Sequence, residues 1–195
     1  MNKLMGFLEL KESSLPTVPL MEYQSGVYLD SKYLWTVRTA VYRGDDLSLP
    51  RKVGVTSEEA VKFADEMQIN MKERGKVFFY PYFIADKSGT LEVRREELII
   101  EAVKGDLWNL VTYSDRDVTY RLSNEYEEID GNRNFLNNEE IEKIRTCGNK
   151  VRGMFRDEIY EGKSILLEWS YAVNTNAERE RLSQPYLVFY EVRTV

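Results

Sequence analysis

Apolar residues gather in short runs along much of the chain, separated by polar turns, which is typical of strands. The segments with this pattern are rich in β-branched and aromatic residues and are bounded by Gly, Asp, Ser and Pro. The strands predicted in this way are 32–42, 77–86, 88–93, 97–103, 107–114, 117–123, 164–173 and 185–195. Pro81 predicts an edge strand or a break, because proline cannot donate a ladder hydrogen bond. Residues 43–55 are predicted as a loop.

Two longer segments have the helical period instead. The first, 56–75, begins with Thr56 and Glu59 spaced as a capping box and ends at Gly75. The second, 138–156, is capped by Asn137 or Asn138, and its apolar positions share one face. A shorter helical pattern lies within 1–30. The chain is therefore predicted to be α+β, with mixed, largely antiparallel sheets and two main helices.

The length and composition indicate a globular protein with a sizeable core. The chain has 195 residues, of which 43% are hydrophobic and 31% are charged. These values favour one domain over residues 1–195, either as one unit or as two lobes of about 1–93 and 94–195. Trp35, Trp108 and Trp169 are interpreted as packing residues.

Several classes of function are excluded by what the chain lacks. It contains no histidine and only one cysteine, Cys147, which rules out Ser–His or Cys–His catalysis, histidine-ligated zinc and a disulfide framework. The formal net charge of −6 argues against a nucleic-acid partner, because binding to phosphate backbones requires clustered cations. We find no secretory signal and no apolar stretch that could span a membrane, so a cytoplasmic location away from the membrane is expected.

The last two predicted strands carry the clearest chemical pattern. If they pair so that Val173 faces Tyr186, then Glu168 faces Glu191, and the two carboxylates point to the same side of the sheet. A cation between them would relieve their repulsion, and magnesium commonly uses one or two carboxylates together with substrate phosphates. The alternative is that the linker bulges, the register slips and both glutamates are solvated. Arg193 lies two residues after Glu191 on the same face of the strand, where it would either clamp a phosphate or neutralise Glu191.

Seven segments also follow one another in a recognisable order: NKLMGFLELKESSLPTVPL (2–20), WTVRTAVYRGDDLSLPRKVG (35–54), FFYPYFIADKSGTLEV (78–93), LIIEAVKGDLWNLVT (98–112), FLNNEEIEKIRTCGNKV (135–151), LLEWSYAV (166–173) and YLVFYEVRTV (186–195). This order resembles the ATP-grasp nucleotide-binding domain of the phosphoenolpyruvate synthase and pyruvate phosphate dikinase family. The resemblance covers almost the whole chain in a trimmed form, because the helical segment usual between Pro19 and Trp35 is nearly absent.

The resemblance implies an ATP-grasp-like fold with ATP and Mg²⁺ as cofactors. The site residues that it implies are Lys3 and Arg38 as phosphate-binding catalytic groups, Arg38, Glu101 and Arg193 as nucleotide-binding groups, and Glu168 with Glu191 as the magnesium pair. For Arg38 and Glu101 the alternative is a side chain on a solvent-exposed face of a strand.

The departures from the family pattern leave two functions open. Leu166 stands where the family has an aspartate, and Asn2 stands where it has a glycine. One function is an ATP- and magnesium-dependent phosphotransferase whose acceptor is a small molecule or lies on another chain, such as a phosphohistidine-carrying or phosphoenolpyruvate-binding protein. The other is a degenerate, non-catalytic binding or regulatory module, so whether the chain is an enzyme stays open. A second copy of the chain is a further candidate partner. An ATP-grasp ligase that forms an acyl phosphate fits the order of motifs less well.

Overall fold

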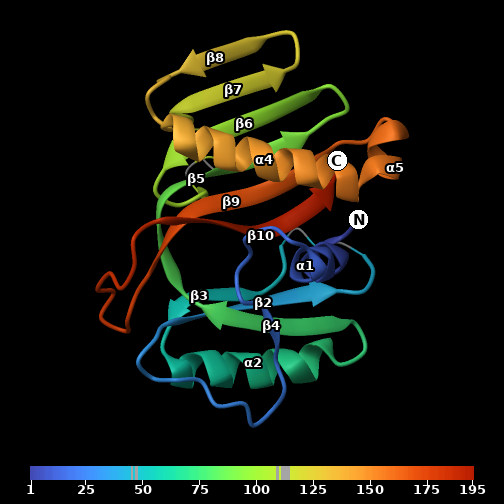
Figure 1. The fold of residues 1–195 in the computed structure, drawn as a ribbon. Helices are drawn as coiled ribbons and strands as arrows, with labels where there is room; N and C mark the ends of the chain where they lie inside the picture. Colours follow the sequence, from blue (N-terminus) through green and yellow to red (C-terminus); the bar gives the residue numbers. More distant parts are fainter. Residues whose placement is uncertain (45, 47, 109, 111–114) are drawn as a thin grey trace.

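The chain folds into two antiparallel sheets and a set of helices, as the computed structural model shows (Figure 1). The structure describes residues 1–44, 46, 48–108, 110 and 115–195. One sheet has four strands in the order β1-β4-β2-β3, and the other has six in the order β10-β9-β5-β6-β7-β8. The predicted α+β class with antiparallel sheets is confirmed.

The elements follow the chain in an order that keeps each sheet nearly contiguous in sequence. The four-stranded sheet contains β1 (Met21–Glu22), β2 (Trp35–Val41), β3 (Arg51–Val55) and β4 (Gly75–Pro81). The six-stranded sheet contains β5 (Phe83–Val93), β6 (Glu97–Lys104), β7 (Val118–Ser123), β8 (Glu127–Gly131), β9 (Ile165–Asn174) and β10 (Tyr186–Thr194). The helices are α1 (Lys3–Glu12), α2 (Ser57–Met71), α4 (Asn138–Met154) and α5 (Arg156–Tyr160).

The break expected at Pro81 marks the passage of the chain from one sheet to the other. Strand β4 ends at Pro81, and β5 begins at Phe83 and runs without interruption to Val93. We call residues 81–83 the hinge. All of β5 belongs to the six-stranded sheet, so the two sheets divide at the hinge, whereas the predicted lobes divide near residue 93. The number of domains stays a prediction.

The strand predictions fail where the local pattern is weak. The predicted loop 43–55 is wrong at its end, because Arg51–Val55 pairs with β2 as β3. Strand β8 is not predicted, since Glu127–Gly131 is polar and almost fully exposed. The strand predicted over 107–114 falls mostly on residues outside those that the structure describes.

Both predicted helices form, and a capping box begins each of them. The predicted helix end at Gly75 is wrong, because α2 ends at Met71 and Gly75 is the first residue of β4. The Thr56 hydroxyl accepts a hydrogen bond from the Glu59 amide, and Asn137 does the same for Glu140, so each helix begins where a side chain satisfies a free backbone amide. The shorter helical pattern predicted within 1–30 forms α1, whereas α5 is not predicted, and the described residues contain four helices in all. No described helix is long and apolar enough to cross a lipid bilayer.

The helices divide the apolar residues into layers (Figure 1). Helix α2 covers the outer face of the four-stranded sheet, and α4 covers the outer face of the six-stranded sheet. The residues that pack under α2 include Ala60, Ala64, Val37 and Phe79, and those under α4 include Ile144, Val151, Leu91 and Leu167. Helix α1 lies between β10 and the four-stranded sheet. The inner faces of the two sheets are therefore turned toward each other.

Helix α1 approaches β10 very closely, because the contact point is a glycine. A Cβ atom built on Gly6 would lie 2.0 Å from the backbone oxygen of Val192. Only a residue without a side chain allows this approach. Its consequence is that Lys3, one helical turn before Gly6, is held near the same strand.

We expect Gly6→Ala to lower the free energy of unfolding by about 1–3 kcal/mol, because the added methyl group must push α1 away from β10. Urea denaturation measures the change. Gly153→Ala is the matched control, since Gly153 also lies in a helix but no atom outside its own helix approaches its Cβ position. The control should raise stability by up to about 1 kcal/mol through helix propensity. Equal effects of both substitutions would contradict the close contact.

Candidate functional site

The hairpin of β9 and β10 brings Glu168 and Glu191 opposite each other. The two strands pair antiparallel, and Glu191 is the cross-strand partner of Glu168. The pairing predicted for these two residues is confirmed, whereas the starting register is wrong, because Tyr186 faces Ala172 and not Val173. An irregularity in β10 shifts the register by one residue between Tyr186 and Glu191, so Glu191 faces Glu168 although the register at Tyr186 differs from the predicted one.

That irregularity is a β-bulge at Tyr190. Phe189 faces Trp169 and Glu191 faces Glu168, so Tyr190 is an extra residue without a cross-strand partner. Phe189 and Val192 are buried in the core under α4, whereas Tyr190 and Glu191 both line the space between the sheets. The bulge thus turns two consecutive side chains to the same side of the strand.

Glu191 is buried and held by two cations from elsewhere in the chain. Arg38 Nη2 donates a hydrogen bond of 2.8 Å to Glu191 Oε2, and Lys3 Nζ lies 3.7 Å from Oε1. The side chain of Glu191 is only 3% exposed. The alternative of solvated glutamates is therefore wrong for this residue, and so is a solvent-facing Arg38, because Arg38 is itself buried. Its guanidinium also lies over the ring of Phe7, 5.3 Å from the centroid.

The position of Lys3 depends on Asn2, the residue just before it in the chain. The Asn2 side chain caps α1 by accepting a hydrogen bond from the Met5 amide. Its Nδ2 donates to the backbone oxygens of Val41, at 3.2 Å, and Tyr42, at 3.0 Å, at the end of β2. Asn2 thereby joins the first turn of α1 to the strand that carries Arg38.

Glu168 is the unsatisfied acid of the pair. Among the described residues its carboxylate has no hydrogen-bond or ion-pair partner, although it faces Glu191. Burial and, to a smaller extent, the negative charge of Glu191 raise the pKa of Glu168 to about 7, against the opposing effect of Arg38, Arg193 and Lys3. A cation placed beside Glu168 would therefore be stabilised.

Arg193 is an unsatisfied cation next to this acid. Its Nε is buried and has no hydrogen-bond partner among the described residues. Its cross-strand neighbour on β9 is Leu166, which offers no acceptor. Arg193 forms no ion pair with Glu191 in the described part of the chain, so neutralisation of Glu191 falls to Arg38 and Lys3.

These residues line one cleft of about 330 Å³ between the inner faces of the two sheets. The cations on its walls are Lys3, Arg38, Arg51 and Arg193, the acids are Asp106, Glu168 and Glu191, and the aromatic residues are Tyr80, Tyr82, Phe83, Trp108 and Tyr190. A volume of this size lies at the lower end of the range for ligand pockets. The lining suits an anionic ligand that also has a flat ring.

Arg51 and Trp108 are cleft residues that the sequence did not reveal. The Arg51 guanidinium lies over the Trp108 ring, 5.6 Å from its centroid, and Trp108 is 48% exposed. The interpretation of Trp108 as a packing residue is wrong, whereas Trp35 and Trp169 are buried. No local signal could have indicated this pair, because the sequence predicts a loop at Arg51 and Trp108 lies in a distant connection between β6 and β7.

Glu101 lies apart from the cleft lining. Its carboxylate accepts hydrogen bonds from Arg116 Nη1, at 2.7 Å, and from the Thr90 hydroxyl, at 3.3 Å. Thr90 is the cross-strand partner of both Glu101 and Glu168, so the three residues form one row across β6, β5 and β9. The row connects Glu101 to the cleft, but Glu101 itself already has a cation.

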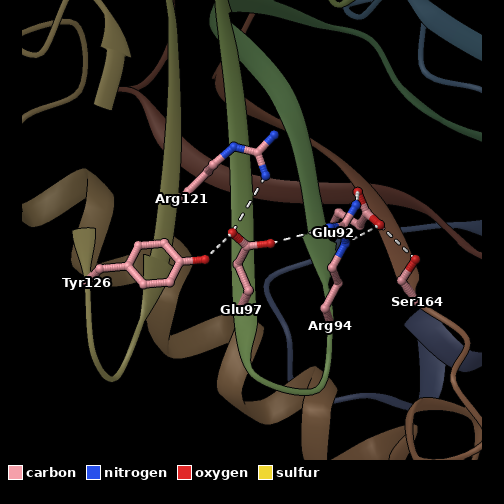
Figure 2. A network of polar contacts seen from close by, with 6 residues as sticks. All are labelled: Glu92, Arg94, Glu97, Arg121, Tyr126 and Ser164. Atoms are coloured by element: carbon pink, nitrogen blue, oxygen red, sulfur yellow. Dashed lines mark hydrogen bonds and ion pairs between the residues drawn. The ribbon is translucent and has the colours of Figure 1, made fainter. Parts of the chain in front are cut away.

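A second polar cluster lies on the six-stranded sheet outside the cleft (Figure 2). Arg94 bridges Glu92 and Glu97, and Glu97 also accepts a hydrogen bond of 2.8 Å from the Tyr126 hydroxyl. Arg121 lies 3.6 Å from Glu97, and Ser164 donates to Glu92. Both acids have partners in this cluster, which indicates that it stabilises the strand ends instead of binding a ligand.

The acids of the cleft could hold a magnesium ion that takes most of its ligands from water or from another bound molecule. No group of three or more acidic, histidine or cysteine side chains that could hold a metal is found among the described residues. Magnesium often uses only one or two carboxylates and takes its other ligands from water and phosphate oxygens. Glu168 and Glu191 could supply that pair, whereas a metal held by protein ligands alone would lack donors.

No protein-family model matches the sequence, and no curated protein matches it.

We expect the stability contributed by Glu168 to fall as pH rises. Between its ordinary pKa of 4.5 and the folded-state value of about 7, the folded chain keeps a proton that the unfolded chain has lost. A glutamine has no proton to lose in this range, so the stability of Glu168→Gln does not fall in this way. The variant should therefore be more stable than the unsubstituted protein at about pH 8, by on the order of 1–3 kcal/mol. Below about pH 4 the difference should vanish.

Denaturation in urea across this pH range measures the effect. Glu66→Gln is the matched control, because Glu66 is exposed on α2, and its effect should not depend on pH in the same way. A difference between Glu168→Gln and the unsubstituted protein that stays constant with pH would show that the carboxyl group keeps its ordinary titration.

Proposed function

We propose that this chain binds ATP with magnesium in the cleft between the sheets and acts as a phosphotransferase domain or subunit related to phosphoenolpyruvate synthase. One observation carries the proposal. Lys3, Arg38 and Arg193, which come from α1, β2 and β10, meet the Glu168–Glu191 pair in a single cleft. Clustered cations beside a pair of carboxylates suit a polyphosphate and its metal ion.

The arrangement of the sheets supports an ATP-grasp-like interpretation. The cleft is lined by residues of both antiparallel sheets. A single hinge joins β4 of one sheet to β5 of the other (Figure 1). The order of motifs along the chain adds to this support. With no matching family model, the proposal depends on the residues and their geometry.

The cleft lining contains both aromatic and cationic side chains, and we assign them to the two parts of the nucleotide. Tyr82 and Phe83, which belong to the hinge, supply aromatic surface that suits the base. Arg38, Lys3 and Arg193 supply positive charge that suits the phosphates. Arg38 and Lys3 already hold Glu191, so these groups are assembled before a ligand arrives.

The phosphate acceptor lies outside this chain in the proposed reaction. The family's acceptor is a histidine, and the sequence contains none. A small molecule, a separate phosphohistidine-carrying or phosphoenolpyruvate-binding protein, or a second copy that contributes another side chain would take that role. Magnesium held by Glu168 and Glu191 would offset the charge of the phosphate oxygens.

We expect calorimetry to show ATP binding that requires magnesium and that Arg193→Gln weakens about 10- to 100-fold. A lost charge-assisted hydrogen bond has this magnitude. Arg193 is chosen because it has no ion-pair partner among the described residues, so its substitution breaks no existing ion pair. Arg95→Gln is the matched control, since Arg95 is exposed and remote from the cleft lining, and it should leave the affinity unchanged.

The absence of both binding heat and thermal stabilisation at millimolar ATP would overturn the proposal. Binding that Arg95→Gln weakens as much as Arg193→Gln would show a non-specific attraction of phosphate to surface cations.

One observation favours the non-catalytic module as a second candidate function. Leu166 occupies the position opposite Arg193, and the buried Nε of Arg193 consequently lacks an acceptor. A carboxylate at position 166 would pair with Arg193 and add a third oxygen donor near Glu168. The leucine therefore removes a metal ligand that the resemblance implies and leaves a cation unbalanced.

We expect Leu166→Asp to discriminate between the two functions. If the chain is a non-catalytic module, the unsubstituted protein binds ATP without hydrolysing it above background, and Leu166→Asp increases the magnesium dependence of binding about tenfold or more. Leu166→Asn is the matched control of equal size without the charge. Phosphate release by the unsubstituted protein that Glu168→Gln abolishes would contradict the non-catalytic alternative.

A further inference from the structure

A second pocket is lined by the hinge, by residues of the segment 18–33 and by residues of the end of β9 and the connection from β9 to β10. This connection is the long loop at the left of Figure 1. Its volume is about 510 Å³, which is well within the range of small-molecule sites. The residues that line it are Val18, Pro19, Tyr33, Pro81, Tyr82, Phe83, Asn174, Thr175, Leu182 and Tyr186. They come from three separate parts of the chain.

None of the lining residues is charged, in contrast to the cleft between the sheets. A phosphate or carboxylate placed here would lose its hydration without a cation in the lining, which is costly. Arg179, whose guanidinium lies 5.5 Å from the centroid of the Tyr82 ring, is not part of that lining. Aromatic side chains make up much of the wall, and they stack favourably on flat rings. The pocket therefore selects against anions and in favour of neutral planar molecules.

One polar group in the wall is unsatisfied. Thr175 is only 2% exposed, and its hydroxyl oxygen has no hydrogen-bond partner in the described part of the chain. The Tyr186 hydroxyl and the Asn174 side chain, which also line the pocket, are hydrogen-bonded to each other, with the hydroxyl as donor. A buried hydroxyl without a partner carries an energetic cost that a ligand donor or acceptor would remove.

We infer that this pocket is a binding site for a small, uncharged, planar heteroaromatic compound that forms a hydrogen bond with the Thr175 hydroxyl. The aromatic wall supplies most of the contact area, and Thr175 sets the orientation of the ring. Tyr82 and Phe83 line both this pocket and the cleft, so the two sites share the hinge. The inference does not depend on ATP binding and goes beyond the proposed function.

Three probes of similar shape test the chemistry. Indole is flat, neutral and has one N–H donor, benzofuran has the same shape without the donor, and indole-3-acetate adds a negative charge. We expect saturable binding of indole in ligand-detected NMR titrations, with benzofuran weaker by about 3- to 10-fold, the loss of one hydrogen bond. Indole-3-acetate should be weaker still, because no cation lines the pocket.

Substitutions locate the site. Thr175→Val keeps the shape and removes the hydroxyl, so it should reduce the affinity for indole to that for benzofuran without lowering the melting temperature. Leu182→Arg should block the pocket, because Leu182 lies on its wall and is exposed enough to be replaced without loss of the fold. Val53→Arg is the matched control, since Val53 is an exposed aliphatic residue that lines the cleft instead.

Indole binding that Leu182→Arg abolishes and Val53→Arg retains would support the inference. The reverse result would place indole in the cleft and overturn it. No saturable binding at millimolar indole would also overturn it, as would equal affinities for the three probes or an affinity that Thr175→Val leaves unchanged.

Discussion

The carboxylate of Glu191 is the point at which three parts of the fold meet. It belongs to the six-stranded sheet, Arg38 belongs to the four-stranded sheet, and Lys3 begins the helix between them. Removing one partner of a buried ion pair leaves an unpaired charge and costs about 3–5 kcal/mol. The two sheets are therefore constrained to a relative position that satisfies Glu191, and the cleft between them has its shape for the same reason.

Two backbone details make this meeting possible. The bulge at Tyr190 turns Glu191 toward the four-stranded sheet while Phe189 and Val192 stay in the core. The missing side chain of Gly6 lets α1 lie against the backbone of β10, which brings Lys3 within reach. Neither detail involves the charged residues themselves, yet both are needed to bring the charges together.

The charges in the cleft are not all satisfied, and the unsatisfied ones mark where a ligand would act. Glu191 has two cations, whereas Glu168 and Arg193 have no ion-pair partner among the described residues. The second pocket has the opposite character, with an uncharged aromatic wall and one unsatisfied hydroxyl. The short hinge thus lines two spaces that select for different chemistry.

The features of this fold that the sequence predicts depend on local interactions. The capping boxes at Thr56 and Asn137, the helical periods that follow them and the break at Pro81 depend on residues a few positions apart, so a pattern in the sequence is sufficient to predict them. The pairing of Glu168 with Glu191 was predicted from a hairpin register that is wrong by one residue, and it is correct because the bulge at Tyr190 offsets that difference.

The features that the sequence did not predict depend on tertiary packing. The bulge that shifts the register by one residue, the pairing of polar Arg51–Val55 as a strand and the contact of Arg51 with Trp108 depend on packing between distant segments. Arg38 and Glu191 are far apart in the sequence, and nothing near either residue indicates that they will share a buried ion pair. The physical reason is that capping hydrogen bonds and hydrophobic periodicity act within one element, so a short stretch of sequence contains them. A buried charge instead needs a partner only once separate elements have packed together and excluded water, so the identity of that partner depends on the whole fold.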